Sequence, residues 1–433
     1  MKNIYITLSS LFIPFLFFLS LAQRLRSIIS NNYPNSVNSR KVVFGSTPLL
    51  NNKYWSKALC DAGHYSKTFV SHYFDSISKE SDWDYLLTSK FKYVPYRIKP
   101  FFAFALSLFK YEIFVLSYRG FFLQNTALRY LQAQLLKLAL KKIIILPYGS
   151  DAYVYKNIRS SSLAHALMIS YPLASRNQNT ILKDIDYWNQ YADAVIPSVM
   201  GFDGLGRWDT IVPNSLALDL EKWNKSERVN LSNGVNGCVN ICHSPNHRGT
   251  KGSEFIINSI NQLKKEGLDI ELLLLEGVQN DDVQFTLNSK VDILIDQLVL
   301  TGHGLHALEG MASGLPTIVN LEDETYTLPM RRWSFLDECP LVSATPEDIT
   351  DVLRELITNP SLRTDLGRAG REYVEKYHGL DSAQYLFENV FDYIYGKKDS
   401  IINLYHPILG EYTNRTSKVK HPLVKNRIVD YQS

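Results

Sequence analysis

Two basic side chains, Arg248 and Lys251, stand in a polar stretch that directly follows a short apolar segment. Gly249 and Gly252 allow the backbone to approach a ligand closely. A helix is predicted to begin here, and the free N–H groups at a helix N-terminus favour anions. This combination predicts a site for an anion such as a diphosphate, with a solvated basic loop as the alternative.

A second polar stretch, residues 301–309, reads TGHGLHALE. Gly302 and Gly304 flank His303 just before a predicted helix, which suits contact of backbone amides with a phosphate or a sugar. Glu309 lies one turn beyond Leu305, toward the expected sheet edge, where a carboxylate is stable only if it has hydrogen-bond donors. The vicinal hydroxyls of a ribose would supply two donors, and a surface salt bridge is the alternative.

The elements around these residues alternate between strand and helix. Strands are predicted at Val239–Cys242, Ile270–Leu275, Val291–Ile295 and Thr317–Asn320. This alternation predicts an α/β domain with a parallel sheet. Both polar stretches follow strands, and such sheets bind ligands at the carboxyl ends of their strands.

The first half of the chain shows the same alternation. Its predicted strands are Val42–Phe44, Lys67–Ser71, Tyr111–Ser117 and Lys142–Leu146, and a helix is predicted at Leu128–Leu140. Proline and asparagine at 213 and 214 break the pattern and predict a hinge between two domains.

The composition bounds the class of protein. At 433 residues the chain is too long for one ordinary α/β core, which predicts two domains with appendages. Hydrophobic residues at 45% and aromatic residues at 12% exclude a disordered chain. A net charge of +3 gives no argument for a nucleic-acid partner. The four scattered cysteines fit a reducing compartment, and their spacing predicts no metal site.

An uncharged apolar run, Ile4–Ala22, lies near the start of the chain. At about 1.5 Å per helical residue it would just span a bilayer core of roughly 30 Å. Arg24 and Arg26 follow the run and only Lys2 precedes it, which favours a body in the cytoplasm. We therefore expect residues 1–30 to form a membrane-anchor helix. A cleaved signal peptide and a helix lying flat in the interface are alternatives, although the run has no polar face.

Residues 396–433 form a basic tail. Its cations are Lys397, Lys398, Arg415, Lys418, Lys420, Lys425 and Arg427. The tail is expected either to meet anionic lipid headgroups or to remain solvated.

Taken together, SPNHRGTKG and GHGLHALEGMASGLP resemble the nucleotide-sugar half of the GT-B glycosyltransferases, of the family-4 retaining type. The resemblance extends from about Lys41 to Tyr395, and its specific motifs lie in the second half. It implies two Rossmann-like, doubly wound domains facing a central cleft. The acceptor domain would be 40–213 and the nucleotide-sugar domain 214–378, with a helix at 379–395 packing back toward the first domain.

The resemblance implies roles for the donor-side residues. Arg248 and Lys251 match the basic pair that holds the donor diphosphate, although Asn246 stands where family members usually place the arginine. Glu309 matches the glutamate that binds the nucleotide ribose. Thr301 replaces the first glutamate of the family's Glu-x7-Glu motif. The loop beside the donor phosphates and sugar is matched by Gly302, His303, Gly304 and Leu305.

On the acceptor side the resemblance is looser. Gly45 and Ser46 match a first-strand loop near the acceptor, and Gly149 and Ser150 match a polar loop close to donor sugar and acceptor. Asp151, in the second of these loops, and His303 are the catalytic candidates that the resemblance implies. An Asx turn is the alternative role for Asp151.

The implied reaction is transfer of a hexosyl group from a nucleotide sugar to an acceptor hydroxyl with retention of configuration. Cations and helix-end amides can stabilise the leaving diphosphate, so we expect neither a metal nor a cofactor. An anchored cytoplasmic enzyme would suit a lipid-linked, capsular or other bacterial envelope glycan. Because Thr301 replaces a glutamate, a nucleotide-sugar-binding or scaffold protein with little turnover is the alternative. A nucleotide-sugar epimerase is a third possibility.

Overall fold

The computed structural model describes residues 2–31, 39–197, 206–212, 215–226, 229–333, 336–412 and 419–428. The chain divides into two compact units. Unit 1 comprises Met1–Val154, Asn177–Thr210 and Ala383–Ile401, and unit 2 comprises Tyr155–Arg176, Ile211–Ser382 and Ile402–Ser433. The division differs from the expected ranges 40–213 and 214–378 chiefly in placing Tyr155–Arg176 in unit 2. The expected hinge residues Pro213 and Asn214 lie outside the described residues.

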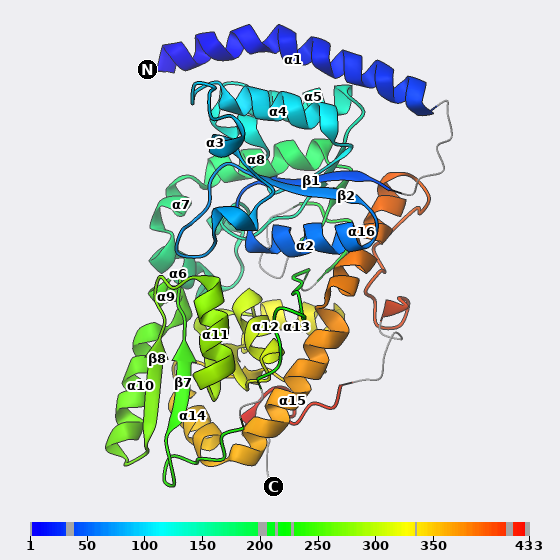
Figure 1. The fold of residues 1–433 in the computed structure, drawn as a ribbon. Coiled ribbons are helices and arrows are strands. Elements are labelled where there is room, and N and C mark those ends of the chain that lie inside the picture. Colours follow the sequence, from blue (N-terminus) through cyan, green and yellow to red (C-terminus); the bar gives the residue numbers. More distant parts are fainter. Residues whose placement is uncertain are drawn as a thin grey trace. The chain divides into compact units, whose positions relative to one another are not determined.

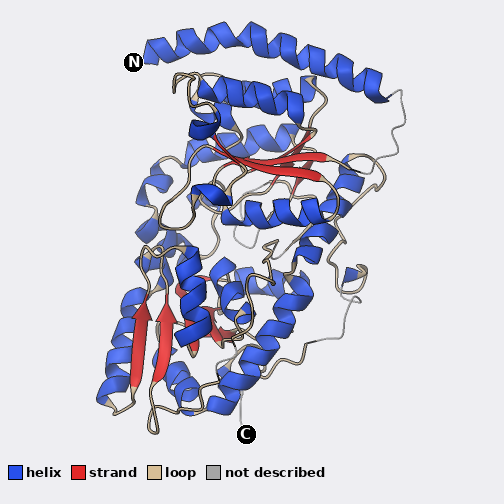
Figure 2. Cartoon of the chain, in the orientation of Figure 1, coloured by secondary structure: helices blue, strands red, loops and turns tan. Residues whose placement is uncertain are grey.

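Unit 1 contains a six-stranded parallel sheet in the order β3-β2-β1-β4-β5-β6, with helices on both faces (Figure 2). Its strands are β1 (Lys41–Ser46), β2 (Tyr65–Val70), β3 (Tyr85–Leu86), β4 (Ile113–Leu116), β5 (Lys142–Ile145) and β6 (Ala194–Val195). The strand order reverses between β1 and β4, and ligands of doubly wound sheets bind beside such a switch point.

The helices of unit 1 are α1 (Lys2–Asn31), α2 (Leu50–Asp61), α3 (Leu87–Lys90), α4 (Lys99–Lys110), α5 (Gln132–Leu138), α8 (Gln178–Tyr191) and most of α16 (Leu380–Ile394). Three short 3-10 turns complete it, at Glu80–Asp82, Phe122–Asn125 and Arg129–Leu131. The single helix predicted over Leu128–Leu140 is wrong at its start, because Tyr130 leaves helical geometry and the α-helix begins only at Gln132.

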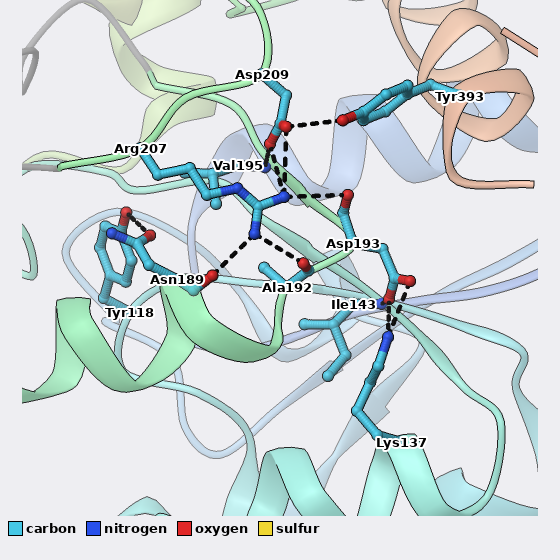
Figure 3. Close-up of polar contacts among 10 residues, drawn as sticks. All are labelled: Tyr118, Lys137, Ile143, Asn189, Ala192, Asp193, Val195, Arg207, Asp209 and Tyr393. Atoms are coloured by element: carbon cyan, nitrogen blue, oxygen red, sulfur yellow. Dashed lines mark hydrogen bonds and ion pairs between the residues drawn. The ribbon is translucent and has the colours of Figure 1, made fainter. Parts of the chain in front are cut away.

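The helix α16 packs with unit 1 although it follows unit 2 in the sequence. Figure 3 shows a polar network around Arg207, whose Nη1 donates to the carbonyl oxygen of Asn189 at 2.8 Å. Arg207 also pairs with Asp209 at 3.2 Å. Asp209 in turn accepts a hydrogen bond of 2.9 Å from the hydroxyl of Tyr393 on α16. The network therefore ties α16 to the chain that enters and leaves β6.

Unit 2 contains a five-stranded parallel sheet in the order β11-β10-β9-β7-β8, whose order reverses between β7 and β9. Its strands are β7 (Val239–His243), β8 (Ile270–Leu274), β9 (Ile293–Thr301), β10 (Thr317–Asn320) and β11 (Val342–Ser343). Its helices are α6 (Ser161–Ser170), α7 (Pro172–Arg176), α9 (Arg248–Lys251), α10 (Ser253–Lys265), α11 (Asn280–Lys290), α12 (Leu305–Ala312), α13 (Glu324–Trp333), α14 (Ile349–Thr358) and α15 (Pro360–Tyr377), with a 3-10 turn at Tyr155–Asn157 (Figure 1).

The two parallel sheets confirm the predicted α/β class, and most predicted strands lie within a residue or two of their observed bounds. The main difference is β9, which runs on to Thr301 instead of ending at Ile295. Asp296 and Gln297 interrupt its apolar pattern, so the sequence underpredicts its length. The two-residue edge strands β3, β6 and β11 were not predicted.

The expectation of a solvated tail is wrong for the apolar side chains of residues 419–428, although the tail's described cations are exposed. Leu423 and Ile428 are buried in the hydrophobic core of unit 2. Between them, Asn426 Nδ2 donates to the carbonyl oxygens of Cys339 at 2.6 Å and Leu341 at 2.9 Å. Residues 419–428 therefore pack onto unit 2 through apolar side chains and one asparagine. A local sequence pattern does not reveal these contacts, because the contacted residues are distant in the sequence.

Candidate functional site

The residues expected to bind a donor gather at the switch point of unit 2. The strands β7 and β9 lie side by side, and His243 at the end of β7 is opposite Ile295. The rest of β9, from Asp296 to Thr301, therefore runs beyond the end of β7. Helix α9, which follows β7, packs against this extension. Its residues Arg248 and Lys251 lie on one helical turn that ends at Gly252 (φ +74°), so the polar stretch that carries them is a separate short helix before α10.

Lys251 is the centre of the site. Its ammonium lies 2.5 Å from Asp296 Oδ1 and 2.9 Å from Gln297 Oε1. The Asp296 side chain is fully buried and that of Lys251 is 14% exposed, so the pair is shielded from water. Burial alone would raise the pKa of Asp296, but the nearby charges of Lys251 and His306 lower it. An ammonium has three N–H donors and described residues accept from two of them, so the third is available to a ligand.

Gln297 connects Lys251 to the glycine-flanked loop. Its Nε2 donates to the carbonyl oxygen of Gly302 at 2.7 Å, while its Oε1 accepts from Lys251. Gly302 has φ +101°, a conformation that favours glycine. A Cβ atom added to Gly304, the residue that precedes α12, would meet no atom within 4 Å. The space beside Gly304, just before α12, is thus open, and Gln297 holds the preceding Gly302 in place.

Glu309 is buried on α12 and already has two partners from the protein. Asn280 Nδ2, at the start of α11, donates to Glu309 Oε1 at 3.0 Å. His306 Nδ1 lies 3.0 Å from Glu309 Oε2. The expected hydrogen bonds to a ribose would therefore be added to, or exchanged with, these contacts. Leu305 is the first residue of this helix.

Three buried histidines around the site are held neutral. Burial lowers the pKa of His303 to about 3, and His378, 6.5 Å away between ring centroids, lowers it further. Burial likewise lowers the pKa of His378 and of His243 to about 4. His243 Nε2 lies 2.8 Å from Ser253 Oγ at the start of α10. Neutral imidazoles donate or accept hydrogen bonds here without adding charge.

Several buried polar atoms of this region lack a hydrogen-bond partner within the described chain. They are Asp296 Oδ2, Thr301 Oγ1, His306 Nε2 and His378 Nε2. A buried donor or acceptor that makes no hydrogen bond costs about 1–3 kcal/mol of stability, so such atoms are rare in folded proteins. Asp296 and Thr301 lie on β9, His306 lies on the first turn of α12 and His378 follows α15, so these atoms are available to polar groups of a ligand.

Arg248 differs from its predicted partner Lys251. It is 40% exposed, and its guanidinium pairs with Glu254 at 2.7 Å and with Glu276 at 3.0 Å. Both carboxylates are also exposed, and ion pairs of this kind contribute little. The structure therefore does not place Arg248 in the buried cluster of Lys251, Asp296 and Gln297.

Helix α6 covers the outside of this cluster. A Cβ atom on Gly249 would lie 2.1 Å from Ile169 Cγ2 of α6, so packing explains the glycine without a ligand. Ser162 Oγ donates to the carbonyl oxygen of Val299 at 3.2 Å. The Tyr171 ring meets His247 edge-on at 4.8 Å between centroids. This packing places Tyr155–Arg176 in unit 2.

Asp151 of unit 1 is buried with its carboxylate fully engaged. It accepts hydrogen bonds of 3.0 Å from the backbone N–H groups of Tyr118, Tyr148 and Gly149. Burial raises its pKa to about 6, although these three bonds oppose the shift. These bonds do not form the Asx turn considered as the alternative, because the local donors Tyr148 and Gly149 precede Asp151 in the chain. Asp151 nevertheless shapes the loop after β5 and ties it to the end of β4.

The other acceptor-side candidates have structural reasons of their own. Gly45 lies within β1, where a Cβ would be 2.2 Å from the carbonyl oxygen of Phe69 on β2. Ser46 ends β1, and its carbonyl oxygen accepts from Ser71 N at 2.9 Å. Gly149 has φ +132°, and Ser150 beside it is half-buried. The structure brings Gly149, Ser150 and Asp151 together in one loop after β5.

The sequence reasoning missed Asp296 and Gln297. The signal was present, because two adjacent polar residues interrupt a strand that is otherwise apolar and buried on both faces. A buried carboxylate in such a strand requires a partner. Asn280 and His306 were also missed, and only the fold reveals that they contact Glu309. No group of three or more metal-ligating side chains is found among the described residues.

The chain resembles solved glycosyltransferase structures. Sucrose-phosphate synthase from Thermosynechococcus elongatus matches with a TM-score of 0.52 and 13% identity, covering 82% of this chain and 99% of the synthase. Anabaena HepE in complex with UDP-glucose matches with a TM-score of 0.51 and 11% identity, over 82% of this chain and 99% of HepE. A glycosyltransferase from Rickettsia africae matches with a TM-score of 0.50 and 12% identity, over 84% and 100%.

These likenesses show that the chain has the GT-B fold, as predicted. No protein-family model matches the chain, and no curated protein matches its sequence. At such low sequence identity, the likeness to these structures shows the fold and nothing more.

Proposed function

We propose that this protein is a glycosyltransferase whose unit 2 binds a nucleotide-diphosphate sugar at the switch point between β7 and β9. The observation that carries the proposal is the set of buried polar atoms of Asp296, Thr301 and His306 that have no partner among the described residues. The GT-B fold supports it, as does the UDP-glucose bound by HepE. Lys251 offers its third N–H to the diphosphate.

In the proposed reaction the bond between the anomeric carbon and the donor phosphate breaks, and its electron pair stays on the diphosphate. The acceptor hydroxyl oxygen forms the new bond to the anomeric carbon, and its proton passes to an oxygen of the departing diphosphate. Negative charge grows on the leaving group, and Lys251 with the open N-terminal amides of α12 would stabilise it. Charge stabilisation of this kind needs no metal. Retention of configuration and a hexosyl donor follow from the family resemblance.

Glu309 would bind the ribose, as in the resembling family, and His303 would border the donor sugar. Gln297 acts as a positioning residue, because it holds Lys251 and the Gly302 carbonyl at the same time. We propose that the acceptor is a glycan or lipid-linked molecule of the bacterial envelope, met at a membrane to which α1 attaches a cytoplasmic body. Among the described helices, α1 alone contains a stretch, Ser10–Ile29, long and apolar enough to cross a bilayer.

A donor panel tests the proposal. UDP-, GDP- and ADP-sugars are incubated with the protein and a membrane extract, and nucleotide release is measured. We expect release from one nucleotide class. Saturable donor binding without nucleotide release would instead favour the binding or scaffold role, which we consider because Thr301 replaces the family's first glutamate. Neither binding nor release with any donor would contradict the proposal.

Gly304→Ala sharpens this test. The added methyl meets no protein atom within 4 Å, and the backbone there (φ −110°) suits alanine, so the melting temperature should not fall. The methyl would enter the space proposed for the donor, and we expect donor affinity to drop about tenfold, roughly 1.4 kcal/mol. An unchanged dissociation constant would place the donor elsewhere.

A further inference from the structure

Helix α1 has an inverted distribution of polar and apolar residues. It lies along α4 and α5 of unit 1 (Figure 1). The side facing the protein includes the polar residues Ser20 and Gln23, which are buried together with Leu16. The outward side carries Leu11, Phe15, Phe17, Phe18, Leu25, Ile28 and Ile29, which are all exposed. A helix on a water-facing surface shows the opposite pattern.

Specific contacts fix this orientation. The Phe12 ring stacks on Phe101 of α4 with 4.3 Å between centroids and an interplanar angle of 7°. The Arg26 guanidinium lies 4.8 Å from the centroid of the Phe109 ring, also on α4. Ser20 satisfies its own hydroxyl by donating to the Leu16 carbonyl oxygen at 2.8 Å. Because one side of α1 is committed to unit 1, the helix is not a free rod available to cross a bilayer.

The surface next to α1 adds aromatic and basic groups. The loop between α3 and α4 exposes Tyr93 and Tyr96, and α4 exposes Phe102 and Phe109. Exposed cations of this region are Arg24, Arg26, Lys90, Lys92 and Arg97. Residues 1–31 and 85–111 contain no aspartate or glutamate, whereas the chain as a whole has 46 basic and 43 acidic residues. A surface that has cations and aromatic rings but no acidic residues, and that lies beside an apolar helix, is suited to bind anionic lipid.

We propose that α1 and the α3–α4 segment form a monotopic membrane-binding surface, with α1 lying in the plane of an anionic bilayer. The outward side chains enter the acyl boundary, the tyrosines lie at headgroup level, and the cations meet lipid phosphates. This explains why the apolar run has no polar face: protein covers one side and lipid the other. The inference refines the membrane attachment but does not depend on the proposed reaction.

Vesicle flotation tests the surface with the full-length protein. The vesicles are phosphatidylcholine alone, or roughly two parts phosphatidylcholine to one part phosphatidylglycerol. We expect stronger binding to the anionic vesicles, weakened by salt. Phe15→Glu/Phe18→Glu should lower partitioning by at least about tenfold, because two charges would enter the acyl region. Phe285→Glu on α11 is the matched control, since Phe285 is 66% exposed and Phe18 67%. Equal loss in both variants would overturn the proposal.

Immersion depth separates the in-plane helix from a spanning one. Leu11, Phe18 and Leu25 recur every seven residues on the outward side and are 68%, 67% and 61% exposed. Each is replaced by a spin-labelled cysteine in a chain carrying Cys60→Ser and Cys238→Ser. An in-plane helix predicts a similar shallow depth at all three positions. A depth that is greatest at Phe18, with the other two near opposite headgroups, would show a spanning helix and overturn the proposal. Dimerisation in solution with no vesicle binding would show that a second copy covers this surface, and would overturn it too.

Discussion

Unit 1 and unit 2 each carry a buried aspartate at the carboxyl edge of a parallel sheet, and the two aspartates differ in how their oxygens are used. Asp151 of unit 1 accepts three backbone hydrogen bonds and closes its own loop. Asp296 of unit 2 holds Lys251 with one oxygen and leaves the other without a protein partner in the described chain. A carboxylate whose contacts are complete shapes the backbone, whereas one with a spare oxygen beside a buried cation is prepared for a ligand.

The largest expected effect comes from Lys251→Met. Losing the ammonium leaves Asp296 as an uncompensated buried charge, which should cost about 3–5 kcal/mol of stability. We expect kcat/KM to fall by about a hundredfold to a thousandfold, as when a charge-stabilising donor is removed. Because the single variant could fail to fold, Lys251→Met/Asp296→Asn is measured beside it by thermal unfolding and donor turnover. The double variant should regain stability but not turnover. Recovered turnover would show that Lys251 serves the fold alone.

The pH dependence of stability should also distinguish the units. His243 and His378 in unit 2 have pKa values lowered to about 4 by burial, from 6.5 in the unfolded chain. The stabilisation of the folded state by these neutral histidines is fully present above pH 6.5. It is lost as the pH falls toward 4, and at about pH 5.5 each histidine has lowered the free energy of unfolding by about 1.4 kcal/mol. Asp151, with its pKa raised to about 6 from 3.8, acts in the opposite sense, and its contribution is lost as the pH rises through 6.

Chemical unfolding between about pH 7.5 and pH 5, monitored by hydrogen exchange, measures this difference. We expect amides of β7 and β9 to lose protection on acidification before those of β4 and β5. The reverse order would contradict the assignment of neutral buried histidines to unit 2.

Asp151→Asn tests whether Asp151, whose carboxylate accepts three backbone hydrogen bonds, has a structural role only. The amide oxygen can keep the bonds from Tyr148 and Gly149, but the Tyr118 N–H loses its acceptor, at a cost of about 1–3 kcal/mol. Turnover per folded molecule should stay within about threefold, since no charge at the reacting atoms changes. A drop of a hundredfold with stability retained would restore Asp151 as a catalytic residue and end the contrast between the units.

Arg248→Ala should have the smallest effect. The Arg248 guanidinium is exposed and pairs with Glu254 and Glu276, so its loss should leave the melting temperature almost unchanged. We expect donor KM to rise by no more than about threefold. Lys264→Ala, on the exposed side of α10, is the matched control for removing a cation near the same unit. An effect as large as that of Lys251→Met would show that Arg248 turns toward the donor when it binds.

Much of the fold was predictable because periodic patterns are local. Strands such as Val239–Cys242 and Thr317–Asn320 are short apolar runs between turn residues, and their alternation with helices requires parallel sheets. The extension of β9 was not predictable from periodicity, since Asp296 and Gln297 interrupt it. The packing of 419–428 into unit 2 and of α6 beside α9 depends on distant partners, which no local window contains.

The sequence by itself determined the two α/β halves, the glycine-flanked loop before α12, and the basic residues that follow β7. Only the tertiary structure decided that Lys251 is buried against Asp296 while Arg248 stays exposed beside Glu254 and Glu276, because these partners come from β9, from α10 and from the chain after β8. It likewise decided that α1 turns its apolar side outward. The spacing of residues establishes which groups are available, and packing establishes which of them still lack a partner.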